Sequence, residues 1–183
     1  MNAANQNMTG AELQTMREAC NLGRDEFAAL VGVEARTVKH WENGRSGVPA
    51  DVADVVKRID HAIGQAVSAG LVALRDLRAG CASGDMALLR YRTAQDLAKY
   101  CADMAGMPLG GHGAILLRFC HAARYLPGFE SVPVRIVWME PAAYEAWRAA
   151  THLADSEATR SAWASFQVAT QAIPHRADQP PRT

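Results

Sequence analysis

The sequence predicts a mainly α-helical protein, with an all-helical N-terminal part and a small α+β C-terminal part. Three observations support this fold class. Apolar residues recur at helical spacing from residue 9 to about residue 77. The segments 86–92 and 132–139 are typical of β-strands, and two helical segments lie between them. At 183 residues, the chain is long enough for one ordinary domain or for two small ones.

Composition and charge narrow the class of protein. Hydrophobic residues make up 49% of the chain and charged residues 21%, which is typical of a globular protein. The formal net charge of zero argues against sequence-independent wrapping of nucleic acid but is compatible with a local basic face. We find no apolar run of membrane-spanning length and no signal segment, so a cytoplasmic location without membrane contact is expected.

Cysteines and histidines give no indication of a cofactor or metal. Cys20, Cys81, Cys101 and Cys120 are spread out without a CxxC pair, which favours buried free thiols over disulfides or zinc. The histidines His112, His121, His152 and His175 share no metal-ligand spacing, and no catalytic arrangement stands out. The sequence therefore predicts neither a cofactor nor enzymatic activity.

Three short helices are predicted at the start, after an Asn- and Gln-rich tail at residues 1–8. Thr9 and Glu12 form a T-x-x-E capping box for a first helix that ends near residues 21–23. A second helix covers residues 24–30 and stops at Gly32. A third covers residues 35–43, with Gly44 as a left-handed cap.

A longer helical segment follows, and Pro49 lies in its first turn. Valine and isoleucine residues form one stripe from Val52 to Val67. The pattern allows either one long helix or two helices broken near Gly64. Because the stripe is longer than a small N-terminal bundle needs, it favours a two-fold dimer.

The C-terminal part is predicted as strand, two helices and strand, followed by further helices. The elements are a strand at 86–92, a helix at 94–104 capped by Thr93, a glycine-rich loop at 106–113, a helix at 114–126, a strand at 132–139, a helix from Pro141 and a last helix at 156–172. The predicted divisions of the chain are a disordered tail 1–8, a DNA-binding domain 9–60, a helical linker or dimerisation segment 61–80, an α+β dimerisation domain 81–173 and a disordered tail 174–183.

Residues 24–43 carry the functional prediction, because two short helices joined by a four-residue turn near Gly32 make a helix-turn-helix. In this motif the N-terminal residues of the second helix contact base edges in the major groove. The run "LGRDEFAALVGVEARTVKHWENGR" resembles the Xre/Cro repressor class without a gap, including its closing W-E-N-G. The resemblance implies a five-helix-type domain.

The candidate contacts follow from the outward face of the third helix and from this resemblance. With Val38 and Trp41 turned inward, the residues that face outward as base contacts are Ala35, Arg36, Lys39 and His40. The resemblance assigns phosphate contacts to Arg24, Asn43 and Arg45, and a largely buried ion pair to Arg17 and Glu42.

The following run "GRSGVPADV" is similar to the anti-CRISPR-associated and YdiL-like regulators, in which a small βααβ domain follows. That family implies a homodimer that binds an inverted repeat in double-stranded DNA and represses its own operon. One branch also binds its own mRNA, so RNA is an alternative partner. Two other functions stay open from the sequence. The chain could be an antitoxin-like interaction protein, or an enzyme or ligand sensor whose C-terminal domain encloses a pocket.

Overall fold

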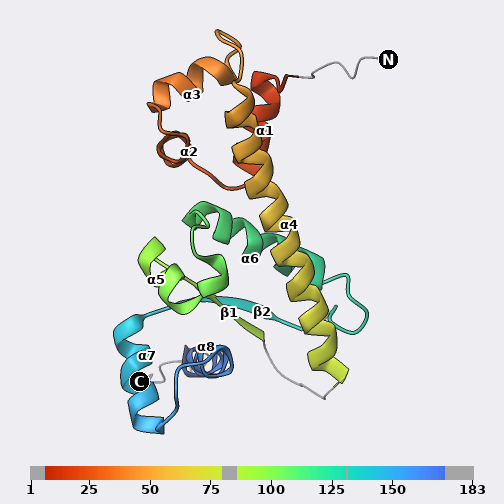
Figure 1. Ribbon diagram of the computed structural model, residues 1–183. Coiled ribbons are helices and arrows are strands. Elements are labelled where there is room, and N and C mark those ends of the chain that lie inside the picture. The colour runs from red at the N-terminus through yellow and green to blue at the C-terminus, as the bar shows by residue number, and fades with distance from the viewer. Residues whose placement is uncertain (1–6, 80–85, 131, 172–183) are drawn as a thin grey trace, which may run out of the picture.

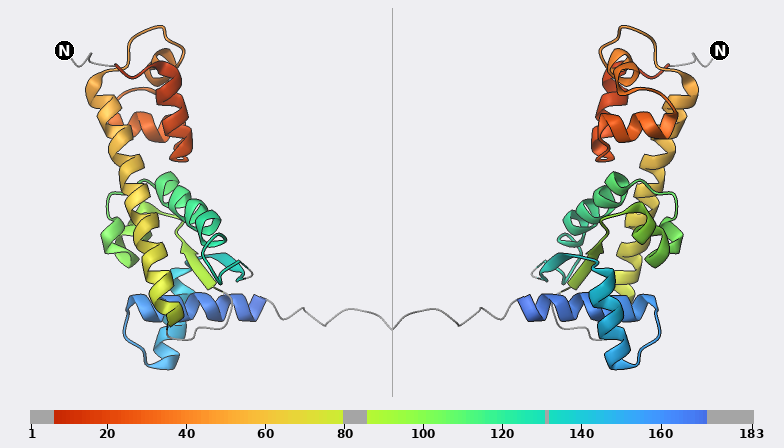
Figure 2. Two further views of the ribbon diagram at one scale, coloured as in Figure 1. Left: turned by 90° about the vertical axis from the view of Figure 1, so that its right-hand side faces the viewer. Right: turned by 90° about the vertical axis from the view of Figure 1, so that its left-hand side faces the viewer.

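The computed structural model describes residues 7–79, 86–130 and 132–171. Three short helices form one end of the molecule, the sheet and the last two helices form the other, and a long helix connects them (Figures 1 and 2). In chain order the elements are α1 (Gly10–Ala19), α2 (Arg24–Val31), α3 (Ala35–Glu42), α4 (Ala50–Ala79), β1 (Met86–Arg90), α5 (Ala94–Tyr100), the 3-10 helix η1 (Ala102–Met104), α6 (Leu109–Ala123), β2 (Val134–Trp138), α7 (Pro141–Thr151) and α8 (Glu157–Gln171).

The N-terminal end begins with the predicted capping box. The Thr9 hydroxyl accepts from the backbone N–H of Glu12 at 3.2 Å, and the Glu12 carboxylate accepts from the backbone N–H of Thr9 at 2.7 Å. The prediction of a tail through residue 8 is wrong at its last position, because Met8 is buried in the same core as Leu13. Met8 precedes the N-cap Thr9 and packs in the same core as Leu13 of α1, an arrangement called a hydrophobic staple. It fixes the angle at which the chain enters α1.

Helix α4 is one continuous helix of 30 residues, which settles the alternative of a break at Gly64. Its first turns complete the core of the N-terminal bundle through Val52 and Val56. Farther along, α4 packs on α6 of the same chain, and Ile63 is fully buried in that core. The apolar stripe is therefore used within the chain, and it no longer argues for a dimer.

The C-terminal part has the predicted order of strand, two helices and strand. β1 and β2 pair in parallel with Met86 opposite Val134, and both are shorter than predicted. The helix expected at 94–104 ends at Tyr100, and a 3-10 turn follows it. Because parallel strands need a long crossover, α5 and α6 are the connection that the topology requires.

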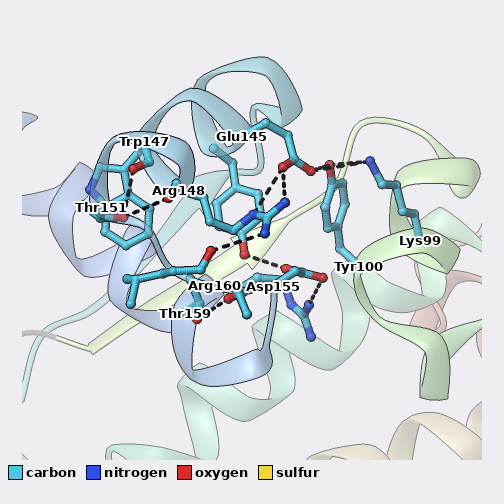
Figure 3. A network of polar contacts seen from close by, with 12 residues as sticks. Lys99, Tyr100, Glu145, Trp147, Arg148, Thr151, Asp155, Thr159 and Arg160 are labelled. Carbon is cyan, nitrogen blue, oxygen red and sulfur yellow. Dashed lines mark hydrogen bonds and ion pairs between the residues drawn. The ribbon is translucent and has the colours of Figure 1, made fainter.

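Helices α7 and α8 complete the C-terminal core. Trp163 of α8 and Tyr144 of α7 are fully buried. They belong to the same core cluster as Tyr91, the residue that follows β1. Polar contacts join the same helices through Asp155, which lies in the turn between them (Figure 3). The Tyr144 hydroxyl of α7 donates to Asp155 at 2.5 Å, and Asp155 pairs with Arg160 of α8 at 2.8 Å. The last helix is therefore an integral part of the C-terminal domain.

The glycine-rich stretch before α6 is helical, so the prediction of a loop at 106–113 is wrong from Leu109 onward. These glycines allow close approach to the N-terminal bundle. A Cβ on Gly110 would collide with the backbone carbonyl of Asn21. The backbone N–H of Gly110 instead donates to the Glu26 carboxylate of α2 at 3.2 Å. The first turn of α6 is thus a junction between the two parts of the molecule.

Replacing Gly110 with alanine is expected to lower the free energy of unfolding by about 1–3 kcal/mol, because the added methyl group overpacks a backbone contact. Gly64 is the matched control, since a Cβ there meets nothing within 4 Å. Alanine at Gly64 should raise the free energy of unfolding by about 0.5–1 kcal/mol. Urea denaturation of both variants measures the difference. Equal effects of the two substitutions would contradict the close junction.

Several predictions concern residues outside the described ranges. They are the tail residues 1–6 and 174–183, Cys81 and His175. The described cysteines Cys20, Cys101 and Cys120 are free thiols. Within the described ranges, none of the helices has the length and apolar character that crossing a membrane requires.

Candidate nucleic-acid interface

The turn between α2 and α3 sets the angle at which α3 is presented. Gly32 ends α2 with a φ of 72°, a left-handed conformation that glycine adopts without strain. The backbone N–H of Val33 returns to the carbonyl of Ala28 at 2.9 Å, and α3 begins at Ala35 after an extended Glu34. The chain therefore reverses within a few residues, and α3 stays close to α2.

Helix α3 has one buried face and one exposed face. Val38 is completely buried and Trp41 is 7% exposed, so both belong to the core of the bundle. Arg36 and Lys39 are exposed on the opposite side. The helix ends as predicted, because Gly44 has a φ of 69° and its N–H bonds to the carbonyl of Trp41. The exposed side is thus strongly cationic, without an acidic residue in the first turn.

Six of the seven predicted DNA contacts line one shallow depression of about 440 Å³. Its walls are formed by Arg24, Asp25, Ala35, Arg36, Lys39, His40 and Arg45. Asn43 is exposed at the end of α3, outside this depression. Because residues from α2, α3 and the following loop meet here, the fold turns separate stretches of sequence into one basic surface.

Asp25 is a member of this surface that the sequence analysis did not identify. Its carboxylate lies among four basic side chains, where it lowers the local positive charge. A carboxylate can also accept a hydrogen bond from the N4 amino group of cytosine. Its position, next to Arg24 at the start of α2, was the signal that could have indicated it.

A buried ion pair holds together the helices that carry this basic surface. Arg17 Nε donates to Glu42 Oε1 at 2.6 Å, with the two side chains only 5% and 1% exposed. Arg17 Nη1 also donates to the carbonyl of Leu22 at 2.6 Å. These bonds join α1, the turn before α2 and the last turn of α3. Glu42 is itself buried, and it holds α3 and the basic surface in place.

Arg24 shares the same carboxylate, which the sequence analysis did not predict. Its Nε donates to Glu42 Oε2 at 2.8 Å, and its side chain remains 40% exposed. The ion pair uses Nε and leaves the two terminal nitrogens for another contact. Arg24 is thus oriented by α3 while its guanidinium lines the depression.

Parts of the chain match a protein family and a known repressor. Residues 9–68 match the family described as a helix-turn-helix domain. A segment of 46 residues is 48% identical to the Aca2 repressor of Pectobacterium phage ZF40. That segment is 25% of this chain and covers 40% of the phage protein, so less than half of that relative is matched. The matches confirm the resemblance to an Xre-type helix-turn-helix regulator of the anti-CRISPR-associated family.

Proposed function

We propose that this chain, whose residues 9–68 form a helix-turn-helix domain, is a dimeric transcriptional repressor that binds an inverted repeat in its own operon. The observation that carries the proposal is the single depression around the exposed face of α3, which gathers Arg24, Arg36, Lys39 and Arg45. A cationic helix face of this kind suits the major groove of DNA.

Each side chain in the depression has a chemical role in this proposal. Arg36 lies in the first turn of α3 and is exposed, so its guanidinium can donate two parallel hydrogen bonds to one guanine. Lys39 and His40 can donate to base acceptors on the next turn, and Ala35 can contact a thymine methyl group. The phosphate contacts are assigned to Arg24, Asn43 and Arg45, which surround the helix.

The proposed dimer uses the C-terminal part of the chain. The sheet has two strands among the described residues, so the outer edge of β2 carries unpaired backbone groups. Ile136 and Trp138 on β2 are 48% and 46% exposed. An open strand edge with exposed apolar side chains favours association with a second copy. The two α3 helices would then be about one turn of DNA apart, roughly 34 Å.

Selection of bound fragments from random DNA duplexes tests this function. We expect enrichment of an inverted repeat whose half-site centres are about 10–10.5 base pairs apart, because two-fold symmetry in the protein requires it in the DNA. Affinity for the selected duplex should fall steeply with salt, since about 6–10 phosphate contacts per dimer release as many counterions. Failure to enrich any duplex, together with co-purification of a specific protein partner, would favour the antitoxin-like alternative.

A further inference from the structure

A second cavity, of about 820 Å³ and open to solvent on one side, lies in the C-terminal part, between α4, β1, α5, η1, α6 and α8. One wall is made of the small residues Ala62, Ala66, Ala69, Gly70 and Ala73 of α4. The facing walls include Leu89, Met104 and Met107. Small-molecule sites in proteins enclose about 300–1,000 Å³, so the cavity has a suitable size. None of its lining residues belongs to the proposed DNA surface.

Two polar side chains in the cavity wall are almost completely buried and incompletely bonded. Tyr91 and His112 are each 5% exposed, and both line the cavity. Their ring centroids are 5.4 Å apart. Within the described part of the chain, no hydrogen bond is formed by the Tyr91 hydroxyl or by Nε2 of His112. Neither atom is sealed from solvent, since Trp163 Nε1 is the one described side-chain nitrogen or oxygen that is both buried and unpartnered. The two polar atoms are therefore open to the cavity, where water or a ligand can bond to them.

The protonation states of His112 and Tyr91 define which kind of hydrogen-bonding group could bind to them. Nη1 of Arg90 lies 3.1 Å from Nδ1 of His112, and a guanidinium can only donate. Nδ1 is therefore the acceptor, and Nε2 carries the ring hydrogen. Burial and the charge of Arg90 lower the pKa of His112 to about 4, which keeps the ring neutral. Burial raises the pKa of Tyr91 to about 12, so its hydroxyl also keeps its hydrogen. Both groups are therefore hydrogen-bond donors in the wall of the cavity.

We propose that this cavity binds a neutral aromatic small molecule whose acceptor oxygen is held by the Tyr91 hydroxyl and the Nε2–H of His112. The aromatic and methionine residues of the lining, among them Tyr100, Met104 and Met107, favour an aromatic body. A neutral ligand avoids the cost of burying a charge, and the rim carries both signs through Asp103, Glu157 and Arg160.

A second copy of the chain fits the cavity less well than a small molecule. A helix inserted between α4 and η1 would bring apolar side chains against the small residues of α4. The backbone carbonyl groups of such a helix are used in its own hydrogen bonds, so an apolar helix face would offer no acceptor to the two donors. The two donors therefore distinguish the proposed ligand from a packed helix. The experiment below also measures whether a second copy of the chain occupies the cavity.

The test uses the full chain without DNA and two probes of nearly equal shape, benzophenone and diphenylmethane. Benzophenone has the acceptor oxygen and diphenylmethane lacks it. Binding is measured by ligand-observed NMR, and near-ultraviolet illumination of bound benzophenone should label the peptide that contains Met104 and Met107. We expect benzophenone to bind more tightly. Tyr91→Phe should weaken its binding by about two- to tenfold, the effect of one neutral hydrogen bond, and should leave diphenylmethane unchanged.

Two tryptophan variants on α4 locate the site. Ala69 lines the cavity, so Ala69→Trp should abolish binding of both probes. Val72 is 54% exposed and does not line the cavity, so Val72→Trp should leave binding unchanged. Equal affinity of the two probes for the unmodified chain would overturn the proposal, as would benzophenone binding that survives Ala69→Trp. Conversion of a dimer to a monomer by Ala69→Trp in light scattering would also overturn it, because a second copy would then cover the cavity.

Discussion

Replacing Glu42 with alanine is expected to lower the free energy of unfolding by about 3–5 kcal/mol, because it leaves the buried Arg17 with only the exposed carboxylate of Glu18, at 3.2 Å, as a charged partner. The Glu42 carboxylate is 1% exposed and accepts from both Arg17 and Arg24. Among the described contacts, Glu42 is the only side chain that joins α1, α2 and α3, so its loss breaks that connection. Chemical denaturation followed by circular dichroism measures the effect.

Two further variants separate this explanation from a general loss of charge. Glu140 pairs with Arg92 at 2.7 Å, but both side chains are about half exposed, so Glu140→Ala should cost less than about 1 kcal/mol. The double variant Arg17→Met, Glu42→Leu removes both buried charges and should recover much of the lost stability. A double variant as unstable as Glu42→Ala would show that the charge is not the cause.

Substitution of Arg36 by alanine is expected to weaken binding to the selected operator by about 1–3 kcal/mol per lost bidentate contact and to relax base preference at one position in each half-site. Arg24→Ala should weaken binding to operator and scrambled duplex alike. It should also reduce the slope of log affinity against log salt by about 1 per bound copy. The two arginines line the same depression, so the contrast isolates base contact from phosphate contact.

The measurement is a titration of both variants against operator, single-base variants and scrambled duplex at two salt concentrations. Arg58→Ala controls for the change in charge, because Arg58 is exposed on α4 outside the depression. The folded fraction of Arg24→Ala is checked first, since this variant also removes a partner of Glu42. If Arg36→Ala lost affinity uniformly across all duplexes, α3 would be contacting the backbone and not the bases.

Local sequence signals predicted the elements well and the contacts between them less well. The Thr9 capping box and the left-handed Gly44 depend on neighbouring residues, so the sequence alone was sufficient for them. The glycines of α6 were misassigned to a loop, because the reason for Gly110 is the backbone of Asn21, which is far away in sequence. The contact between Arg24 and Glu42 was missed for the same reason. The cavity walls come from six elements, and no single stretch of sequence contains that pattern.

The junction between α6 and the N-terminal bundle has a consequence for the DNA. Gly110 contacts Asn21 and Glu26, and Arg118 of α6 bonds to Asp60 of α4 and to the carbonyl of Ala19. These bonds and the unbroken α4 hold α3 at a fixed position relative to the C-terminal domain (Figure 1). In the proposed dimer, neither α3 helix can shift to suit an unfavourable half-site spacing. The duplex must bend or twist instead, so flexible pyrimidine–purine steps between the half-sites should be preferred although no side chain touches them.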